Sequence, residues 1–230
     1  MKVGGIVLCG GKSSRMGRTK ATLPFGPELM LQRVVRLLSL ETDPVIVVAA
    51  PDQELPDLPD TVRLTRDRRE HRGPLEGLYA GLLGLADQGV EAAYASSCDV
   101  PLLARGFVRR MIDLLGDYQI AVPQEDRFCH PLAAVYRTNV IGAIKQLLDQ
   151  DQLRPAFLFD RVPTLRVPTA QLAEVDPRLD SLANLNRPQD YMAALTAAGF
   201  TASEELASEF ESDSRTVSRG SSDTSDSNAG

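Results

Sequence analysis

Residues 8–20 (LCGGKSSRMGRTK) combine three glycines, two serines and four cations directly after an apolar run. Glycine frees the backbone to turn sharply and to bring its N–H groups close to a ligand. The serine hydroxyls can donate hydrogen bonds, and fixed cations share the negative charge of phosphate groups. The cations are Lys12, Arg15, Arg18 and Lys20. This combination predicts a loop that binds a chain of phosphates, whereas an ordinary glycine-rich turn leaves the four cations unexplained.

Two well-known phosphate motifs do not account for this loop. Residues 11–13 (GKS) match the end of a P-loop, but that motif needs glycine at position 6, which is Ile6. The G-x-G-x-x-G pattern of dinucleotide-binding folds is also absent from the segment. The sequence therefore predicts a phosphate loop of a different type.

Two carboxylates are candidates for the same site. Asp99 follows a predicted strand and precedes Pro101, and a carboxylate there suits Mg²⁺, which prefers hard oxygen ligands. Its alternative role is to cap the segment that follows. Asp67 lies in the basic run 66–72, so it either accepts hydrogen bonds from the base or ribose of a nucleotide, or pairs with neighbouring arginines. That basic run holds an anionic second substrate or is simply solvated.

Three further polar residues remain open between two roles. Asn184 and Asn186 lie two positions apart on a segment predicted to be extended, so both side chains point to one face. They either contact a second substrate or satisfy a turn. His130 lies between Cys129 and Pro131, and we expect a core or loop histidine rather than a general base.

Alternating strands and helices must position these residues. The predicted strands are 3–9, 45–50, 62–65, 92–97, 120–123 and 131–136, and the predicted helices are 29–40, 73–89, 107–115, 140–148 and 188–198. Residues 124–130 are expected to form a polar loop, and residues 154–175 fit no single element. The order predicts a Rossmann-like α/β fold, a three-layer α/β/α sandwich with a mostly parallel sheet. In such sheets ligands bind beyond the carboxyl ends of the strands, where the phosphate loop and Asp99 fall.

Composition bounds the class of protein. The chain has 230 residues with 43% hydrophobic and 24% charged residues, which predicts one domain with a core of its own. Residues 203–230 carry a net charge of −5 and the remaining chain −1, so we expect a disordered Ser/Asp/Glu-rich tail and no nucleic-acid partner. The three cysteines lack disulfide or zinc spacing. Without a signal peptide or long apolar stretch, we expect a cytoplasmic protein with no membrane contact.

The motif Gly10-Gly11-x-Ser13-x-Arg15-Met16-Gly17-x-x-Lys20 resembles the signature loop of a large group of nucleotidyltransferases. Within them the chain is most similar to the molybdenum cofactor guanylyltransferases (MobA-type). Further matches follow in order: Asp67 before Gly73-Pro74-Leu75-x-Gly77-Leu78, then Cys98-Asp99-x-Pro101, His130-Pro131-Leu132 and Asn184-x-Asn186-x-Pro188. The resemblance covers about residues 1–200, the expected nucleotidyltransferase domain. One departure stands out, because Ala50-Pro51 occupies the end of the second predicted strand, where members often have asparagine.

The resemblance implies a nucleotide-diphospho-sugar transferase-like fold and Mg²⁺-dependent transfer of a guanylyl group from GTP to molybdopterin, with pyrophosphate as leaving group. It assigns the metal to Asp99, and we expect Lys20 and Arg15 to act with Asp99 in catalysis and Asn184 and Asn186 to bind the acceptor. The nucleotide-binding residues that it implies are Leu8, Cys9, Gly10, Gly11, Ser13, Lys20, Asp67 and Asp99. Transient contact with other proteins of molybdenum cofactor biosynthesis, or with acceptor proteins, is a further expectation.

Three alternatives stay open on the sequence alone. A related transferase would use CTP with molybdopterin or with a sugar phosphate, although the Gly10-Gly11 pair favours guanine. A non-catalytic nucleotide sensor would use the same loop without turnover, but sensors can lose either Lys20 or Asp99, and both are present. A pure interaction protein acting through its acidic tail would leave the loop cations unexplained.

Overall fold

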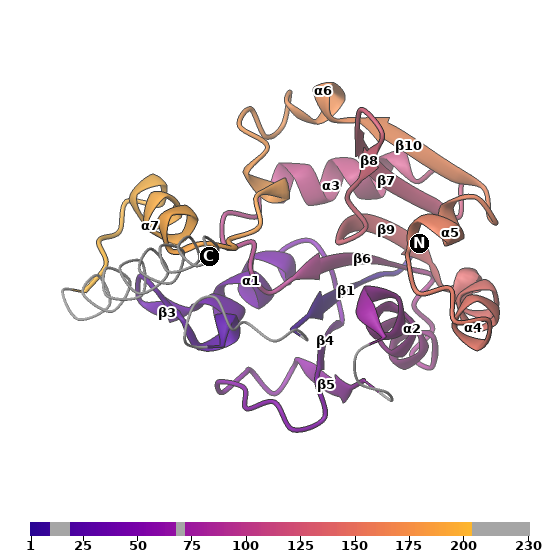
Figure 1. The fold of residues 1–230 in the computed structure, drawn as a ribbon, viewed down its shortest axis with the longest axis horizontal. Helices are drawn as coiled ribbons and strands as arrows, with labels where there is room; N and C mark the ends of the chain where they lie inside the picture. The colour runs from indigo at the N-terminus through magenta and orange to yellow at the C-terminus, as the bar shows by residue number, and fades with distance from the viewer. Residues whose placement is uncertain (10–18, 68–71, 204–230) are drawn as a thin grey trace, which may run out of the picture.

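The computed structural model describes residues 1–9, 19–67 and 72–203 of the chain. A twisted sheet runs through the middle of the molecule, with helices on both sides (Figure 1). The strands of this eight-stranded sheet, within the described residues, are β1 (Val3–Leu8), β4 (Val45–Ala49), β5 (Arg63–Arg66), β6 (Ala92–Ser97), β7 (Ile120–Glu125), β8 (Phe128–Cys129), β9 (Ala133–Arg137) and β10 (Thr164–Pro168).

The sheet is mostly parallel, as the alternating pattern predicts. Its strand order is β10-β7-β9-β6-β1-β4-β5, and β8 pairs with β7. Central strand β1 runs parallel to both β4 and β6. Strand β5 pairs in parallel with β4, and β10 pairs in parallel with β7. Only β9 and the short β8 run antiparallel to their neighbours among the described strands. The carboxyl ends of β1, β4, β5, β6 and β7 therefore meet at one edge of the sheet.

Alternation along each strand divides the core into two layers. In β1, Val7 packs with α1 and α3, whereas Ile6 and Leu8 pack with α2 and α4 on the other face. These helices are α1 (Met30–Leu38), α2 (Gly73–Ala86), α3 (Arg105–Leu114) and α4 (Ile141–Asp149). Each places an apolar stripe on the sheet, since burial of apolar surface is what fixes a helix to a sheet face. The predicted three-layer α/β/α sandwich is confirmed.

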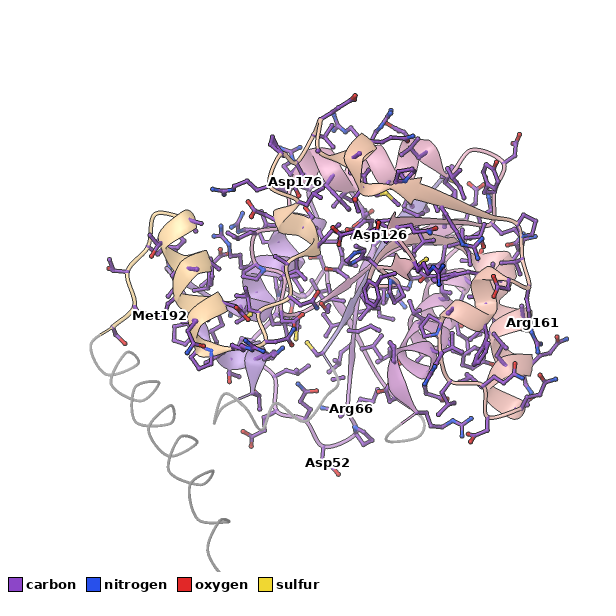
Figure 2. The ribbon with its side chains drawn as sticks, turned by 45° about the horizontal axis from the view of Figure 1, so that its top comes forward. Asp52, Arg66, Asp126, Arg161, Asp176 and Met192 are labelled. Atoms are coloured by element: carbon purple, nitrogen blue, oxygen red, sulfur yellow. The ribbon has the colours of Figure 1, made fainter. Side chains whose placement is uncertain are left out.

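A third, smaller apolar cluster lies beside the main sheet. It joins a short hairpin, β2 (Pro24–Phe25) and β3 (Glu28–Leu29), to the closing helix α7 (Pro188–Ala197). Phe25 and Tyr191 are both fully buried there, with their rings edge to face and centroids 6.2 Å apart. Helix α7 stands to one side of the sheet, where Figure 2 labels Met192, while Arg161 lies on the opposite side.

The structure differs from the sequence expectations, or adds to them, in four places. The hairpin β2–β3 was not predicted, and residues 124–130, expected to be a loop, contain β8 in an antiparallel pair with β7. The ambiguous stretch 154–175 forms α5 (Ala156–Phe159), β10 and α6 (Thr169–Leu172). Residues 182–186 begin in a 3-10 turn, η3 (Asp180–Leu182), rather than being extended throughout. The predicted disordered tail lies outside the described residues, apart from residue 203.

No helix in the described ranges has the length and apolar character that a membrane span requires.

Candidate functional site

The central feature of the site is an ion pair between Lys20 and Asp99. The Lys20 Nζ lies 2.6 Å from Asp99 Oδ2, and the two side chains are 18% and 10% exposed. Lys20 begins the 3-10 turn η1 (Lys20–Thr22), and Asp99 comes two residues after β6 at the carboxyl edge of the sheet. Because the pair is largely removed from water, its charges interact more strongly than those of a surface pair.

Two asparagines complete this cluster. Asn186 Oδ1 accepts a hydrogen bond from Lys20 Nζ at 2.9 Å, and Asn184 Nδ2 donates to Asp99 Oδ1 at 2.9 Å. The Ser97 hydroxyl also donates to Asp99 Oδ1. Asn184 and Asn186 therefore face the same site, as their two-residue spacing predicts. Lys20, Asp99, Asn184 and Asn186, with Ser97, are called the lysine–aspartate cluster below.

Backbone contacts hold the asparagine segment against the end of β6. The Leu185 N–H donates to the Asp99 carbonyl at 3.0 Å, and the Leu185 side chain points the other way into the cluster of α7. Upstream, the buried Asp176 carboxylate accepts the N–H groups of Asp180 and Ser181. These bonds fix the path of the chain, so the two asparagines reach the site from a rigid support.

Asp67 forms a second polar position at the same edge. It follows β5, and its N–H donates to the Ala49 carbonyl at 2.9 Å. Its Oδ1 is buried, and within the described residues no donor satisfies it. Burial, with the nearby charge of Glu76, raises the pKa of the Asp67 carboxyl to about 6. A buried acceptor without a partner costs stability, so this oxygen is suited to a ligand that donates hydrogen bonds.

The end of β1 lies between these two positions in the strand order. A Cβ added to Gly77 of α2 would lie 3.1 Å from Leu8 Cδ2 and 3.5 Å from Asp67 Oδ1, so the absence of a side chain there lets all three approach. The Leu8 carbonyl accepts the Cys98 N–H at 3.0 Å. A hydrogen bond with Cys98 is the largest cause, and burial the second, of a pKa of the Cys9 thiol that is well above its usual range. The Cys9 side chain is therefore a neutral thiol that packs in the core.

Gln53 belongs to the same edge and was missed in the sequence. Its Nε2 donates to the Cys9 carbonyl at 3.1 Å, and its Oε1 accepts the Ala50 N–H at 3.2 Å. The Gln53 carboxamide thus lies at the end of β4. The family pattern has asparagine at that place, and this chain has Ala50-Pro51. Arg66 fixes the same turn by donating to the Ala50 and Gln53 carbonyls, beside Asp52 in Figure 2. No sequence pattern in the Pro/Asp-rich connection of residues 51–60 indicated that Gln53 belongs to the site.

Arg72 has a role other than the expected ones, and His130 has the expected one. Arg72 donates to Asp151 Oδ1 at 2.9 Å and to the Leu148 carbonyl, and it lies 3.6 Å from Glu76 Oε2. It therefore joins α2 to the end of α4 and is neither solvated nor available to an anionic substrate, which corrects both expectations for this residue. His130 has a buried Nε2, and burial lowers the pKa of its imidazole, as suits the expected loop histidine.

Residues 10–18 of the phosphate loop lie outside the described residues. Gly10, Gly11, Ser13 and Arg15 belong to residues 10–18, and Arg68 and Arg69 belong to residues 68–71. Their assignments stay predictions. Of the remaining candidates, the structure brings Lys20, Asp99, Asn184 and Asn186 into direct contact, and it places Asp67 at the same edge, three strands away.

The donor set fits a hard cation that is shared with a substrate. In the described ranges, no group of three or more His, Cys, Asp or Glu side chains is placed to hold a metal ion. Mg²⁺ usually takes one or two protein carboxylates and completes its shell with waters and substrate phosphates. The lysine–aspartate cluster offers one carboxylate, Asp99, and one nearby amide oxygen, Asn186 Oδ1, both held in place. One carboxylate and one amide oxygen are chemically compatible with Mg²⁺.

Comparisons with known proteins extend this description. The model of the family described as "MobA-like NTP transferase domain" matches residues 5–163. A protein of Mycolicibacterium paratuberculosis named "probable molybdenum cofactor guanylyltransferase" is 34% identical over 201 residues, covering 86% of this chain and 97% of its own. A protein of Mycobacterium tuberculosis with the same name is 35% identical over 190 residues, covering 80% of this chain and 92% of its own.

Solved structures show the same fold. Molybdopterin-guanine dinucleotide biosynthesis protein A from Archaeoglobus fulgidus matches with a TM-score of 0.69 at 18% identity, over 86% of this chain and 99% of its own. The 2-C-methyl-D-erythritol 4-phosphate cytidylyltransferase from Thermus thermophilus matches with a TM-score of 0.59 at 16% identity, over 86% and 99% of the two chains.

The sheet topology, the lysine–aspartate cluster and these relatives together define an enzyme of the nucleotidyltransferase class. Within that class, the chain belongs to the MobA-like NTP transferase family, as its N-terminal motif predicts.

Proposed function

We propose that this protein transfers a guanylyl group from GTP to molybdopterin. A terminal phosphate oxygen of molybdopterin attacks the α-phosphorus of GTP in line, and a new P–O bond forms. The bond from the α-phosphorus to the bridging oxygen breaks, and pyrophosphate leaves. Lys20 beside Asp99, at the edge where the phosphate loop begins, is the observation that carries this proposal.

Each residue of the lysine–aspartate cluster has a role in this reaction. Within the described residues, the partners of Lys20 are one carboxylate and one amide oxygen. Its ammonium group can move from them to phosphate oxygens when a nucleotide binds. There it balances the charge that develops on the α-phosphate and the leaving group, with Arg15 from the loop. Preorganised cations of this kind supply most of the catalysis in phosphoryl transfer.

Asp99 is the proposed Mg²⁺ ligand, with Asn186 close by. The metal would supply charge neutralisation on the phosphate oxygens when bound. Ser97 and Asn184 both donate to Asp99 Oδ1, so the carboxylate keeps its orientation whether or not Lys20 remains beside Oδ2. Asn184 and Asn186 are also proposed to face the acceptor, because both contact the Lys20–Asp99 pair.

Asp67 is the proposed partner of the nucleotide. The guanine base carries an N–H and an exocyclic amino group on one edge, and both are hydrogen-bond donors. An ionised carboxylate is an acceptor only, so the unsatisfied Asp67 Oδ1 complements such an edge. The Leu8 and Cys9 carbonyls and the Gln53 carboxamide border the same region.

The experiment that tests donor choice is calorimetry with GTP, CTP, ATP and UTP in the presence of Mg²⁺. We expect GTP to bind most tightly, and Asp67→Asn to reduce that preference. Tightest binding of CTP would contradict the guanine assignment and indicate a cytidylyltransferase, a class with the same fold. Binding of none of the four would overturn nucleotidyl transfer by this chain.

A nucleotide sensor without turnover would keep the binding and lose the chemistry. Single-turnover incubation of the enzyme with GTP, Mg²⁺ and molybdopterin separates the two, since only a transferase releases pyrophosphate.

A further inference from the structure

Arg33 on α1 is a partly buried cation that touches three separate segments. Its Nε donates to the Pro101 carbonyl at 2.7 Å. Its guanidinium carbon lies 5.0 Å from the Phe25 ring centroid and 5.5 Å from that of Phe200. Its Nη1 lies 3.7 Å from Glu28 Oε2, and the side chain is 16% exposed.

The contacts of Arg33 need an arginine rather than any cation. The Phe25 and Phe200 rings are edge to face with centroids 6.0 Å apart, so one planar guanidinium can contact both. Burial lowers the pKa of Arg33, because the charged guanidinium loses part of its hydration. A lysine at this position would keep the charge but lose the planar contact and the fixed Nε–H donor.

Each segment that Arg33 touches leads directly to the lysine–aspartate cluster. Pro101 comes two residues after Asp99. Phe25 lies in the hairpin that follows the turn begun by Lys20. Phe200 follows α7, and α7 begins two residues after Asn186. Lys20, Asp99 and Asn186 come from distant parts of the chain. Arg33 contacts the segment that follows each of them, through Phe25, Pro101 and Phe200.

Gly26 gives independent evidence that these supports are tightly joined. Its φ of +66° is in the left-handed region, and an added Cβ would lie 2.6 Å from Phe200 Cε2. The hairpin and the segment after α7 therefore pack so closely that no side chain fits between them. The Tyr191 hydroxyl of α7 also donates to the Pro24 carbonyl.

We propose that Arg33 is a positioning residue that keeps Lys20, Asp99 and Asn186 in mutual contact for nucleotidyl transfer. It touches none of the reacting groups and acts through Pro101 and the two phenylalanines. The proposal rests on the function proposed above, and it adds a residue on a helix remote from the phosphate loop. A displacement of about 1 Å at a reacting group can cost on the order of 10²-fold in rate, so a support of this kind has a measurable effect.

The chain offers a matched control in Arg36. This residue is also on α1, and its Nε and Nη2 donate to Glu28 at 2.6 and 2.7 Å. Its side chain is 49% exposed, and no contact with Pro101 or with either phenylalanine is found in the described residues. Loss of one positive charge and of one Glu28 contact is therefore common to Arg36→Met and Arg33→Met. Only Arg33→Met also removes the link to Pro101.

The test compares kcat, KM for GTP and thermal unfolding of Arg33→Met, Arg33→Lys and Arg36→Met. We expect kcat to fall by roughly 10- to 100-fold in both Arg33 variants with a smaller change in KM, assayed well below their unfolding temperatures. Arg36→Met should stay within about twofold of the parent protein, since exposed ion pairs contribute little. Equal losses in Arg33→Met and Arg36→Met, or an unchanged kcat in both Arg33 variants, would overturn the proposal.

A second readout does not depend on activity. The chain has four lysines, so the side-chain resonances of Lys20 can be assigned by NMR on the labelled full-length protein. We expect the Lys20 signal to shift in Arg33→Lys and to stay in place in Arg36→Met, because only the first loosens the Asp99 support. An unmoved Lys20 signal in a folded Arg33 variant would overturn the positioning role, even if the protein proved to have no guanylyltransferase activity.

Discussion

The Lys20 Nζ donates a hydrogen bond to Asp99 Oδ2 at 2.6 Å, although the two residues are 79 positions apart in the chain. The other carboxylate oxygen is held by Ser97 and Asn184. The lysine thus stands at the Asp99 oxygen that we propose as a ligand of Mg²⁺. The proposed binding of a metal–nucleotide complex requires Lys20 to move from Asp99 to the phosphates.

Removing either member of this pair should impair catalysis far more than folding. We expect Lys20→Met and Asp99→Asn each to lower kcat by about 10²- to 10³-fold, as loss of one preorganised charge at a transition state does. The unfolding free energy of Lys20→Met should fall by only about 1–2 kcal/mol, because Asp99 keeps two donors. Steady-state kinetics and urea unfolding measure the two effects.

The control for this pair is Lys145→Met, which breaks an exposed pair with Asp149 at 2.6 Å. That variant should keep the parent kcat. Parent rates in both Lys20→Met and Asp99→Asn would show that the reaction takes place elsewhere.

Competition between Lys20 and a metal for Asp99 predicts that a substitution which lowers kcat raises the affinity for the metal. Without nucleotide, Lys20→Met should bind Mn²⁺, used as a probe for Mg²⁺, more tightly than the parent protein, because Asp99 Oδ2 loses its ammonium partner. With GTP present the same variant should bind the nucleotide more weakly. Electron paramagnetic resonance of free Mn²⁺ measures the first effect. Weaker Mn²⁺ binding by nucleotide-free Lys20→Met would argue against competition at Asp99.

The raised pKa of Asp67 predicts how nucleotide affinity depends on pH. The pKa of Asp67 is raised to about 6. At lower pH the carboxyl is protonated and loses acceptor capacity, and at higher pH the carboxylate accepts hydrogen bonds from the base. GTP affinity should therefore rise between pH 5 and pH 7 and then level off. Calorimetry across this range on the parent protein and on Asp67→Asn provides the check. A rise of the same size in Asp67→Asn would assign the titration to another group.

Gly26→Ala should destabilise the junction between hairpin and C-terminal segment. The substitution combines a left-handed φ of +66° with overlap of the Phe200 ring, so we expect a loss of about 2–4 kcal/mol. Gly199→Ala is the matched control, because Gly199 has a φ of +78° but nothing within 4 Å of an added Cβ. It should lose only about 1–2 kcal/mol. Equal losses in thermal or urea unfolding would mean that Phe200 does not constrain Gly26.

The parts of the site that follow from the sequence are those tied to regular elements. Asp99 comes after a buried strand, and strand ends converge at one edge of a parallel sheet, so its place could be predicted. The two-residue spacing likewise predicted that Asn184 and Asn186 share a face. The sheet and its helices were predictable because their apolar periodicity extends over whole elements.

Other parts depend on contacts that no local pattern contains. Strands of two residues, such as β2 and β3, are too short to show periodicity, so the hairpin was missed. Gln53 reaches Cys9 across 44 positions, and Arg72 reaches Asp151 across 79, and only the folded chain brings these groups together. No sequence pattern distinguishes Arg33 from other charged helix residues, because its contacts are with three separate segments of the folded chain.

The most direct test of the central claim is product formation by the purified protein with GTP, Mg²⁺ and molybdopterin, followed by mass spectrometry. The account predicts molybdopterin guanine dinucleotide and an equal amount of pyrophosphate, with little product from CTP and with on the order of 10²-fold slower formation by Asp99→Asn. Absence of the dinucleotide from a protein that binds GTP, or formation at the parent rate by Asp99→Asn, would contradict the account.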